Sequence, residues 1–309
     1  MKKICVIGSI NADITMRVPR FVQPGETLRG TEVHFFPGGK GANQAVAAAR
    51  LGGEVYLAGR MGGDPYAAEI MRQFQASGLR REAVEIDPEQ STGTALIQVA
   101  DDGQNAICIV AGANDTVNPL FLRRVQRYAD DCDIMLFQLE IPMETLLYAV
   151  KDYHPKGKLI ILDPAPAAEL HNELLRHVDI ITPNETELRQ LTGIDPVDDA
   201  ARLQACEALA ARGVKTVLHK AGGKGCYLYH EGGMKHIPSY EVTPVDTTAA
   251  GDSFNGALAN ALARGLSLEE AADFANLVGA LSTLALGAQN AMPTMVQAEK
   301  AAGRLRKRA

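Results

Sequence analysis

The sequence predicts an α/β protein with a doubly wound, mostly parallel, Rossmann-like sheet and a small antiparallel β lid beside it. Two observations support this prediction. Short apolar runs alternate with helical patterns along most of the 309 residues, which is typical of the strand–helix units that build a parallel sheet. Two segments interrupt that alternation. A chain of this length suits one large domain, so we expect a single domain that spans residues 1–309.

The predicted strands of the main sheet are continuous apolar runs rather than alternating ones. This pattern is expected where helices cover both faces of a parallel sheet. Several of the runs end in turn or capping residues, such as Gly8 and Asp163. In chain order the strands are residues 3–7, 134–137, 159–162, 180–182, 216–218 and 226–229.

Helical patterns fall between and after these strands. The first six are residues 41–51, 65–77, 118–128, 144–153, 185–191 and 200–212. Two further helices, 252–264 and 268–286, are rich in Ala and Leu. The basic run 304–308 is predicted as a solvated last helical turn.

The lid is predicted from the two segments that break the alternation. Residues 14–37 contain no good helical pattern. Residues 92–110 form two strand-like runs joined by the sequence DDG at 101–103, which favours a hairpin turn. We therefore expect a lid built from about 14–37 and 92–110.

Composition and charge exclude several classes of protein. Lys plus Arg number 31 against 37 Asp plus Glu, a net charge of −6, which argues against a nucleic-acid partner because phosphates need basic patches. No run reaches the ~18 apolar residues of a membrane span, and the first apolar run stops before Asn11. The five cysteines are scattered, without the spacing of a disulfide framework or a zinc site. We expect a cytoplasmic protein with no membrane partner.

The strongest motif is PVDTTAAGDSFNG at residues 244–256. Small residues precede a helix there, and the unpaired N–H groups at a helix start can hold an anion that develops during phosphoryl transfer. Asp252, in the first turn, can accept a proton from a hydroxyl nucleophile. The alternative is that Asp252 is only an N-cap behind a glycine-rich segment.

Two further motifs lie near the N-terminus. Residues 37–44 read PGGKGANQ, in which glycines allow close approach to a ligand and Lys40 and Asn43 offer donors. The spacing is not that of a Walker A loop, and the alternative is a plain turn before a helix. Residues 8–13 read GSINAD, and Asn11 with Asp13 suits the recognition of hydroxyl groups at a strand end. The missing GxGxxG disfavours a nicotinamide dehydrogenase.

These three motifs, in this order, resemble the ribokinase family of carbohydrate kinases over essentially the whole chain. The two long signatures, GGKGANQ and DTTAAGD, lie about 200 residues apart. Further matches are PGET at 24–27, QLE at 138–140, PAP at 164–166 and TPNETE at 182–187.

The resemblance implies a role for each matching residue on the sugar side of the site. Asn11 and Asp13 would hold sugar hydroxyls, and Asp252 would be the base on the primary hydroxyl. The residues that would close over or flank the sugar are Gly39, Lys40, Asn43 and Glu140, and those of the anion hole are Ala249, Ala250 and Gly251.

The resemblance also implies a nucleotide site and two cation sites. Glu187 would act on Mg²⁺, through water, and Lys220 departs from the family's usual Thr. ATP would be bound by Asn184, Lys220, Gly222, Gly225, Gly251 and Asn276. An activating K⁺ would lie near Asp246, Thr248, Ser282, Ala285, Gly287 and Ala291.

These matches lead to the expectation of an ATP-dependent kinase that phosphorylates the primary 5-hydroxyl of D-ribose to give D-ribose 5-phosphate and ADP. Pairing of two lids would give a homodimer. Alternatives are a kinase for 2-deoxyribose, another small sugar or a nucleoside, and a sugar-binding regulator that has lost catalysis. For Asp246 the alternative to a K⁺ ligand is a cap of the turn that bonds to Thr248.

Overall fold

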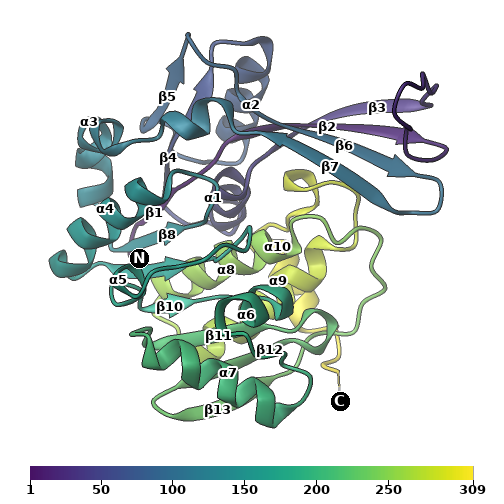
Figure 1. Cartoon of the computed structure of the whole chain (residues 1–309). Helices are drawn as coiled ribbons and strands as arrows, with labels where there is room; N and C mark the ends of the chain where they lie inside the picture. The colour runs from purple at the N-terminus through teal and green to yellow at the C-terminus, as the bar shows by residue number, and fades with distance from the viewer. Residues whose placement is uncertain (309) are drawn as a thin grey trace.

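The computed structural model describes residues 1–308 and contains one large twisted sheet (Figure 1). Its nine strands run in the order β13-β12-β11-β10-β9-β8-β1-β4-β5. Neighbours from β5 to β11 pair in parallel, and β12 and β13 add an antiparallel edge. The strands are β1 (Ile4–Ile7), β4 (Val55–Gly62), β5 (Val84–Asp87), β8 (Ile134–Phe137), β9 (Leu159–Leu162), β10 (Ile180–Ile181), β11 (Thr216–Lys220), β12 (Cys226–His230) and β13 (Gly233–Ile237).

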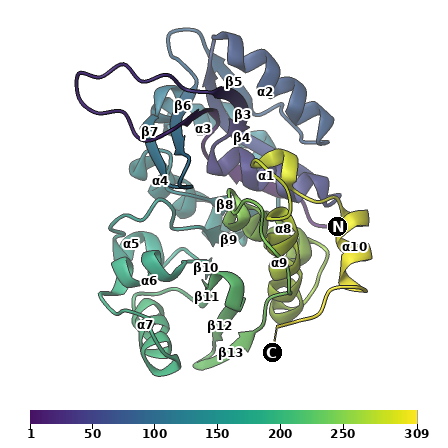
Figure 2. The same cartoon turned by 90° about the vertical axis from the view of Figure 1, so that its right-hand side faces the viewer.

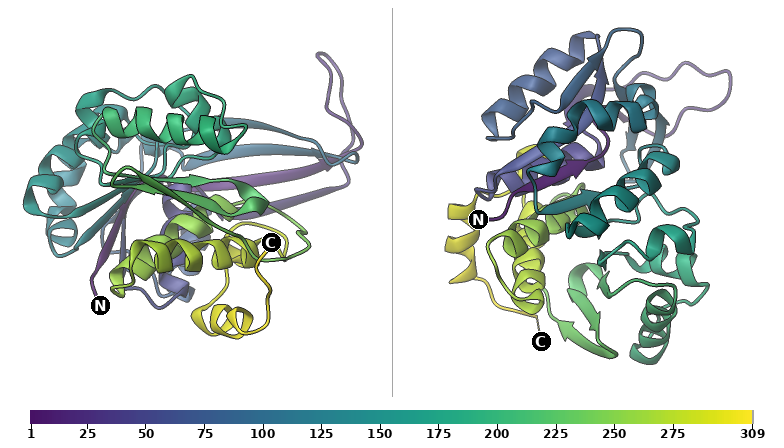
Figure 3. Two further views of the ribbon diagram at one scale, coloured as in Figure 1. Left: turned by 90° about the horizontal axis from the view of Figure 1, so that it is seen from below. Right: turned by 90° about the vertical axis from the view of Figure 1, so that its left-hand side faces the viewer.

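Helices cover both faces of this sheet, so the chain forms three layers (Figure 3). Alternate residues of β1 enter opposite cores: Ile4 and Val6 pack on one face, Cys5 and Ile7 on the other. The first face carries α1 (Lys40–Arg50), α2 (Pro65–Ala76), α8 (Ala250–Ala263), α9 (Leu268–Ser282) and α10 (Met295–Ala302). The second carries α3 (Pro119–Asp130), α4 (Met143–Tyr153), α5 (Asn172–Leu175), α6 (Glu185–Thr192) and α7 (Asp199–Ala211).

A second, four-stranded sheet projects from the main one (Figures 1 and 2). The pairs β2–β3 and β6–β7 are antiparallel, as predicted, but β2 and β6 join the two pairs in parallel. Because β2 begins only four residues after β1 ends, this sheet grows directly out of the carboxyl edge of the main sheet. Its strands are β2 (Asn11–Val18), β3 (Glu32–Gly38), β6 (Gly93–Ala100) and β7 (Asn105–Val110).

Local capping explains why most predicted helices begin where the sequence indicates. Asp64 and Asn118 accept backbone N–H bonds at the starts of α2 and α3, each followed by Pro at the first helical position. Asn184 and Ser267 form capping boxes at α6 and α9. Short 3₁₀ turns complete the chain: η1 (Gly112–Thr116), η2 (His154–Lys156), η3 (Gly222–Lys224) and η4 (Gln289–Ala291).

Two predicted helical stretches are wrong. The helix predicted over 268–286 ends at Ser282, where the hydroxyls of Ser282 and Thr283 bond back to carbonyls three residues earlier. The turn predicted over 304–308 ends early. Arg304 and Leu305 bond back to Ala301 O, but from Arg306 on the chain is extended, because Arg306 and Arg308 pair through their backbones with Glu241 and Ser239. Within residues 1–308, no helix is both long and apolar enough to cross a bilayer.

Candidate active site

The candidate site lies at the carboxyl ends of the parallel strands, around the β1–β8 pair. The chain leads from β1 to α1 on one face and from β8 to α4 on the other, so a crevice opens where the connections diverge. Ser9 follows β1, Glu140 follows β8 and Asp163 follows β9, while Lys220 ends β11. The fold thus brings together side chains that are far apart in the sequence.

Asp252 is the buried centre of this site. It lies in the first turn of α8 and is only 6% exposed. Its two carboxylate oxygens accept hydrogen bonds from Asn43 Nδ2 and Gln44 Nε2, each at 3.0 Å. Burial raises the pKa of Asp252 above its ordinary value, although nearby Lys40 acts in the opposite direction. The alternative that Asp252 is only the N-cap of a helix is wrong, since the N-cap of α8 is Ala249.

The turn before Asp252 has an unusual backbone. Ala249 has φ 57°, in the left-handed region that costs a residue with a side chain about 1–2 kcal/mol. No side chain caps the N-terminus of α8. The Ala250 N–H donates to Thr247 O at 3.2 Å, and the N–H groups of Gly251 and Asp252 stay available to a ligand. Ala250 and Gly251 line the adjoining cavity. A strained turn that presents free N–H groups to a cavity is the local arrangement an anion hole requires.

A chain of hydrogen bonds ties Asp252 to a second buried carboxylate. Gln44 Nε2 also donates to Asp163 Oδ2 at 2.8 Å, and Lys220 Nζ donates to Asp163 Oδ1 at 2.8 Å. Gln44 Oε1 in turn accepts from Gln138 at 2.7 Å. The sequence predicted no site role for Gln44, and it predicted Asp163 only as a turn or capping residue. The available signals were weak: an Asp directly after a buried strand, and a Gln one helical turn beyond Lys40.

The predicted sugar residues gather on the lid side of Asp252. Burial raises the pKa of Asp13 to about 7, and the charges of Glu140 and Asp252 add to the effect. A side chain at position 38 would collide with this carboxylate, because a Cβ on Gly38 would lie 2.0 Å from Asp13 Oδ2. Asn11 is buried, and its Oδ1 accepts from Asn114 Nδ2 at 2.7 Å.

The start of α1 closes the other side of this region. Gly39, with φ 86°, is the N-cap of α1. Glu140 accepts hydrogen bonds from the Ser9 hydroxyl and from the backbone N–H of Lys40. Burial alone would lower the pKa of Lys40, but the surrounding carboxylates raise it above its ordinary value, so the ammonium stays charged. Those carboxylates are Asp252, Asp163, Glu140 and Glu187.

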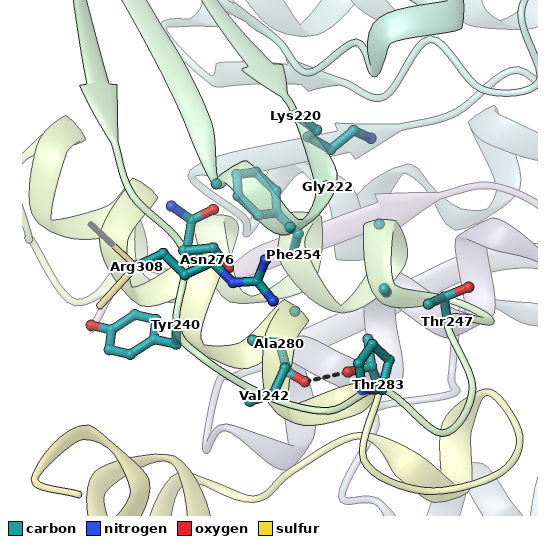
Figure 4. Close-up of a pocket in the computed structure, with 17 residues that line it drawn as sticks. Lys220, Gly222, Tyr240, Val242, Thr247, Phe254, Asn276, Ala280, Thr283 and Arg308 are labelled. Atoms are coloured by element: carbon teal, nitrogen blue, oxygen red, sulfur yellow. Dashed lines mark hydrogen bonds between the residues drawn. The ribbon is translucent and has the colours of Figure 1, made fainter. Parts of the chain in front are cut away.

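A cavity of about 220 Å³ lies on the far side of Asp252, between β11, α8 and α9 (Figure 4). Asn276, from α9, is buried in its wall and donates to Ile237 O at 2.9 Å. Tyr240, Phe254 and Arg308 also line the cavity and were not predicted as site residues. The predicted nucleotide residues that line it are Lys220, Gly222, Gly225, Gly251 and Asn276.

Asn184 and Glu187 are not among the residues that line this cavity. They form the capping box of α6, in which Asn184 Nδ2 and N each donate to a different oxygen of Glu187 at 2.8 Å. Asn184 forms an isolated bridge with Lys220, which places the start of α6 beside the end of β11. Burial raises the pKa of Glu187, while Lys220 acts against the rise.

Three of the residues predicted to hold the monovalent cation are linked by hydrogen bonds, which run from Thr248 and Gly287 to Asp246. Asp246 Oδ1 accepts from Thr248 N and Oδ2 from Gly287 N, each at 2.9 Å. Burial would raise the pKa of Asp246, but the bond from the Thr248 hydroxyl, at 2.6 Å, and these two N–H bonds hold it below its ordinary value. The side chain of Asp246 therefore caps its turn and also ties that turn to the loop after α9. The Ser282 hydroxyl donates to Gly279 O, and its oxygen keeps two lone pairs that can accept.

The chain matches the domain described as pfkB family carbohydrate kinase over residues 1–295. A ribokinase of Bacillus subtilis is 40% identical over 300 residues, which cover 97% of this chain and 99% of the relative. A ribokinase of Haemophilus influenzae is 39% identical over 293 residues, or 95% and 96% of the two chains. A deoxyribokinase of Salmonella typhi is 34% identical over 296 residues, again 95% and 96%.

A solved structure supports the same relationship. The structure of Arabidopsis thaliana ribokinase complexed with ribose and ATP superimposes with a TM-score of 0.91 at 35% identity, covering 97% of this chain and 98% of that one. The predicted fold class and family are confirmed. Two signatures that meet at Asp252, and a match along almost the whole chain, show that this chain belongs to the pfkB family of carbohydrate kinases.

Proposed function

We propose that this protein is an ATP-dependent kinase that phosphorylates the primary 5-hydroxyl of D-ribose, giving D-ribose 5-phosphate and ADP. The observation that carries the proposal is the position of Asp252. Its buried carboxylate lies between the region of Asp13 and Glu140 and the cavity lined by Lys220 and Gly251. The ribokinases among the relatives, and the complex with ribose and ATP, support the choice of both substrates.

In this proposal the sugar binds between Asp13, Asn11 and Glu140, with its primary hydroxyl directed to Asp252. Asp252 accepts the hydroxyl proton as the oxygen attacks the γ-phosphorus, and the bond from that phosphorus to the β,γ-bridging oxygen breaks to release ADP. The N–H groups of the turn at Ala249–Gly251, with Lys40 and Lys220, stabilise the negative charge that develops on the transferred phosphoryl group. The raised pKa of Asp252 suits it to this role.

Mg²⁺ bound with the nucleotide would neutralise phosphate charge in this site. The site itself supplies too little positive charge to balance the phosphates, because its five acidic side chains outnumber its two lysines. In residues 1–308 no cluster of three or more His, Cys, Asp or Glu is arranged as a metal site. Both oxygens of Glu187 accept hydrogen bonds from Asn184 at the start of α6, and in this proposal Glu187 acts on Mg²⁺ through water. The acidic groups are Asp13, Glu140, Asp163, Glu187 and Asp252, and the lysines are Lys40 and Lys220.

We also propose that a monovalent cation, usually K⁺ in this family, binds beside the turn that precedes Asp252. The link between Asp246 and Gly287 supports this, because it joins the two predicted halves of the site. Carboxylate, hydroxyl and carbonyl oxygens are suitable ligands for such a cation. The other residues, Thr248, Ser282, Ala285 and Ala291, would contribute mainly backbone carbonyls. The cation would fix the geometry of the turn without contacting either substrate.

A homodimer through the lid is the last part of the proposal. In a sheet, paired residues share a face and alternate along each strand. The register Ile14↔Leu96 and Met16↔Val33 places an apolar set on the face opposite to Asp13. Met16, Val33, Leu96 and Val110 of that face are exposed hydrophobic side chains. A second copy of the lid would remove this surface from water.

The test is an assay of ADP release with D-ribose, 2-deoxy-D-ribose and adenosine as acceptors, with ³¹P NMR to locate the new phosphate. We expect turnover with D-ribose and a phosphate on its C5 oxygen. Preference for 2-deoxy-D-ribose would favour the alternative that the deoxyribokinase relative suggests. Sugar binding without ADP release would favour the non-catalytic regulator, and the complete Asp252 network argues against that outcome.

A further inference from the structure

A short segment after α10 reaches the nucleotide cavity through Arg308, which is one of its lining residues. We call residues 306–308 the strap. Its backbone pairs with the segment 239–241: Glu241 N donates to Arg306 O at 2.9 Å and Arg308 N donates to Ser239 O at 2.8 Å. Figure 4 shows Arg308 beside Asn276 and Tyr240, with its guanidinium over the cavity. The proposed function gives this segment no role.

Side chains fix the strap to the body of the protein. Lys307 Nζ forms an ion pair with Asp273 Oδ1 at 2.8 Å. Tyr240, which forms a bridge with Lys307, also donates its hydroxyl to Asp273 at 3.3 Å. These contacts fix the backbone at Arg308 before any ligand binds, so the exposed side chain starts from a defined point beside the cavity and less chain entropy is lost on binding.

From this geometry we infer that Arg308 contacts the nucleobase of the bound nucleotide. Lys220 and Gly251 mark the phosphate end of the cavity, since Lys220 Nζ lies 3.6 Å from the point that a Cβ on Gly251 would occupy. Arg308 lies at the end of the cavity opposite to the phosphate end. It is bonded to Ser239, two residues beyond the Ile237 carbonyl that Asn276 contacts.

The chemistry of this end suits a planar base. Gly225, Gly279 and Ala280 line the cavity, and their small size leaves room for a flat ring. A planar guanidinium stacks on aromatic and heteroaromatic faces. Arg308 Nη1 lies 3.1 Å from the point that a Cβ on Gly223 would occupy. The glycine therefore leaves room for the guanidinium. This inference rests on the ATP part of the proposed function and not on the identity of the sugar.

The test compares the binding of ADP, AMP and adenosine to the full chain by isothermal titration calorimetry. We expect Arg308→Ala to weaken all three ligands by a similar factor, roughly 2- to 30-fold. Arg306→Ala is the matched control, because Arg306 is exposed, lies in the same strap and is not among the cavity-lining residues. It should stay within about twofold of the wild type, and thermal unfolding should confirm that both variants fold.

Three outcomes would overturn the inference. Unchanged ADP affinity in Arg308→Ala would show that Arg308 does not contact the nucleotide. An equal loss of affinity in Arg306→Ala would assign the effect to the backbone of the strap. If Arg308→Ala weakened the binding of ADP but not that of adenosine, the guanidinium would contact the phosphates and not the base. The proposed function fails separately: a wild-type protein that binds ADP but phosphorylates no sugar would contradict it while this comparison still stands. A wild-type protein that binds none of the three ligands would overturn both.

Discussion

The carboxylate of Asp252 is the single group on which turnover should depend most. Asp252→Asn keeps the size of the side chain and one oxygen that can accept from Asn43 or Gln44, but it removes the base and one of the two hydrogen bonds. We expect kcat to fall by ~10²–10⁴-fold, the usual contribution of a general base, with thermal unfolding close to the wild type. Asp115→Asn, an exposed change on η1, should leave kcat unchanged. Activity of Asp252→Asn within tenfold of the wild type would rule out the role.

Gln44 positions that carboxylate rather than reacting itself. Its hydrogen bond lowers the pKa of Asp252, so Gln44→Leu should raise that pKa and move the acidic limb of the kcat–pH profile to higher pH. A merely structural loss would lower kcat without moving the limb. The matched control is Gln75→Leu on the exposed side of α2, which should leave the profile in place. An unmoved limb in Gln44→Leu would contradict the positioning role.

Asp13 should govern the affinity for the sugar. Asp13→Ala should raise KM for the sugar and leave KM for ATP nearly unchanged, and the exposed lid change Asp101→Ala should alter neither. With a pKa raised to about 7, Asp13 gains a proton as the pH falls through 7 and loses the charge that strengthens its bonds to hydroxyls. The wild-type sugar KM should therefore rise between pH 8 and pH 6, and that rise should be absent in Asp13→Asn. A selective rise in KM for ATP would contradict the assignment.

At the scale of an element, we expect the turn from Asp246 to Asp252 to couple cation binding to catalysis. Its strained residue, Ala249, has to be held by its surroundings. If a cation helps to hold it, replacing Na⁺ by K⁺ at constant ionic strength should raise the rate several-fold or lower the sugar KM.

That response should vanish in Asp246→Ala and persist in the exposed control Asp115→Ala. Equal rates in Na⁺ and K⁺ would leave Asp246 with the capping role that its bonds to Thr248 and Gly287 already provide. Ala291, where a Ser hydroxyl is common in the family, would then be the first position to examine.

At the scale of the whole molecule, the lid should decide the oligomeric state. Leu96, exposed on the lid face opposite to Asp13, would be buried between two copies. Leu96→Glu should convert a dimer to a monomer in sedimentation equilibrium, because it would bury a charge without a partner. Val296→Glu, an equally drastic change at an exposed site on α10, should leave the mass unchanged. A wild-type monomer would contradict the dimer outright.

The sequence by itself determined the features that depend on near neighbours. Strand–helix alternation identified six of the nine strands of the main sheet and missed β4, β5 and β13. Caps such as Asn118 marked helix starts to within a residue or two, because a cap bonds to N–H groups only two or three positions away. The two long signatures identified the family and, with it, Asp252. The confirmed fold class and kinase family required no knowledge of tertiary contacts.

Tertiary structure alone decided how distant segments meet. The bond from Gln44 to Asp252 joins residues 208 positions apart, and that from Lys220 to Asp163 joins residues 57 apart. The parallel pairing of β2 with β6 and the strap that carries Arg308 are contacts of the same kind. Each depends on which strand ends and loops the packed sheet brings together. Periodicity reports only the local environment of a residue and carries no record of its partner across the fold.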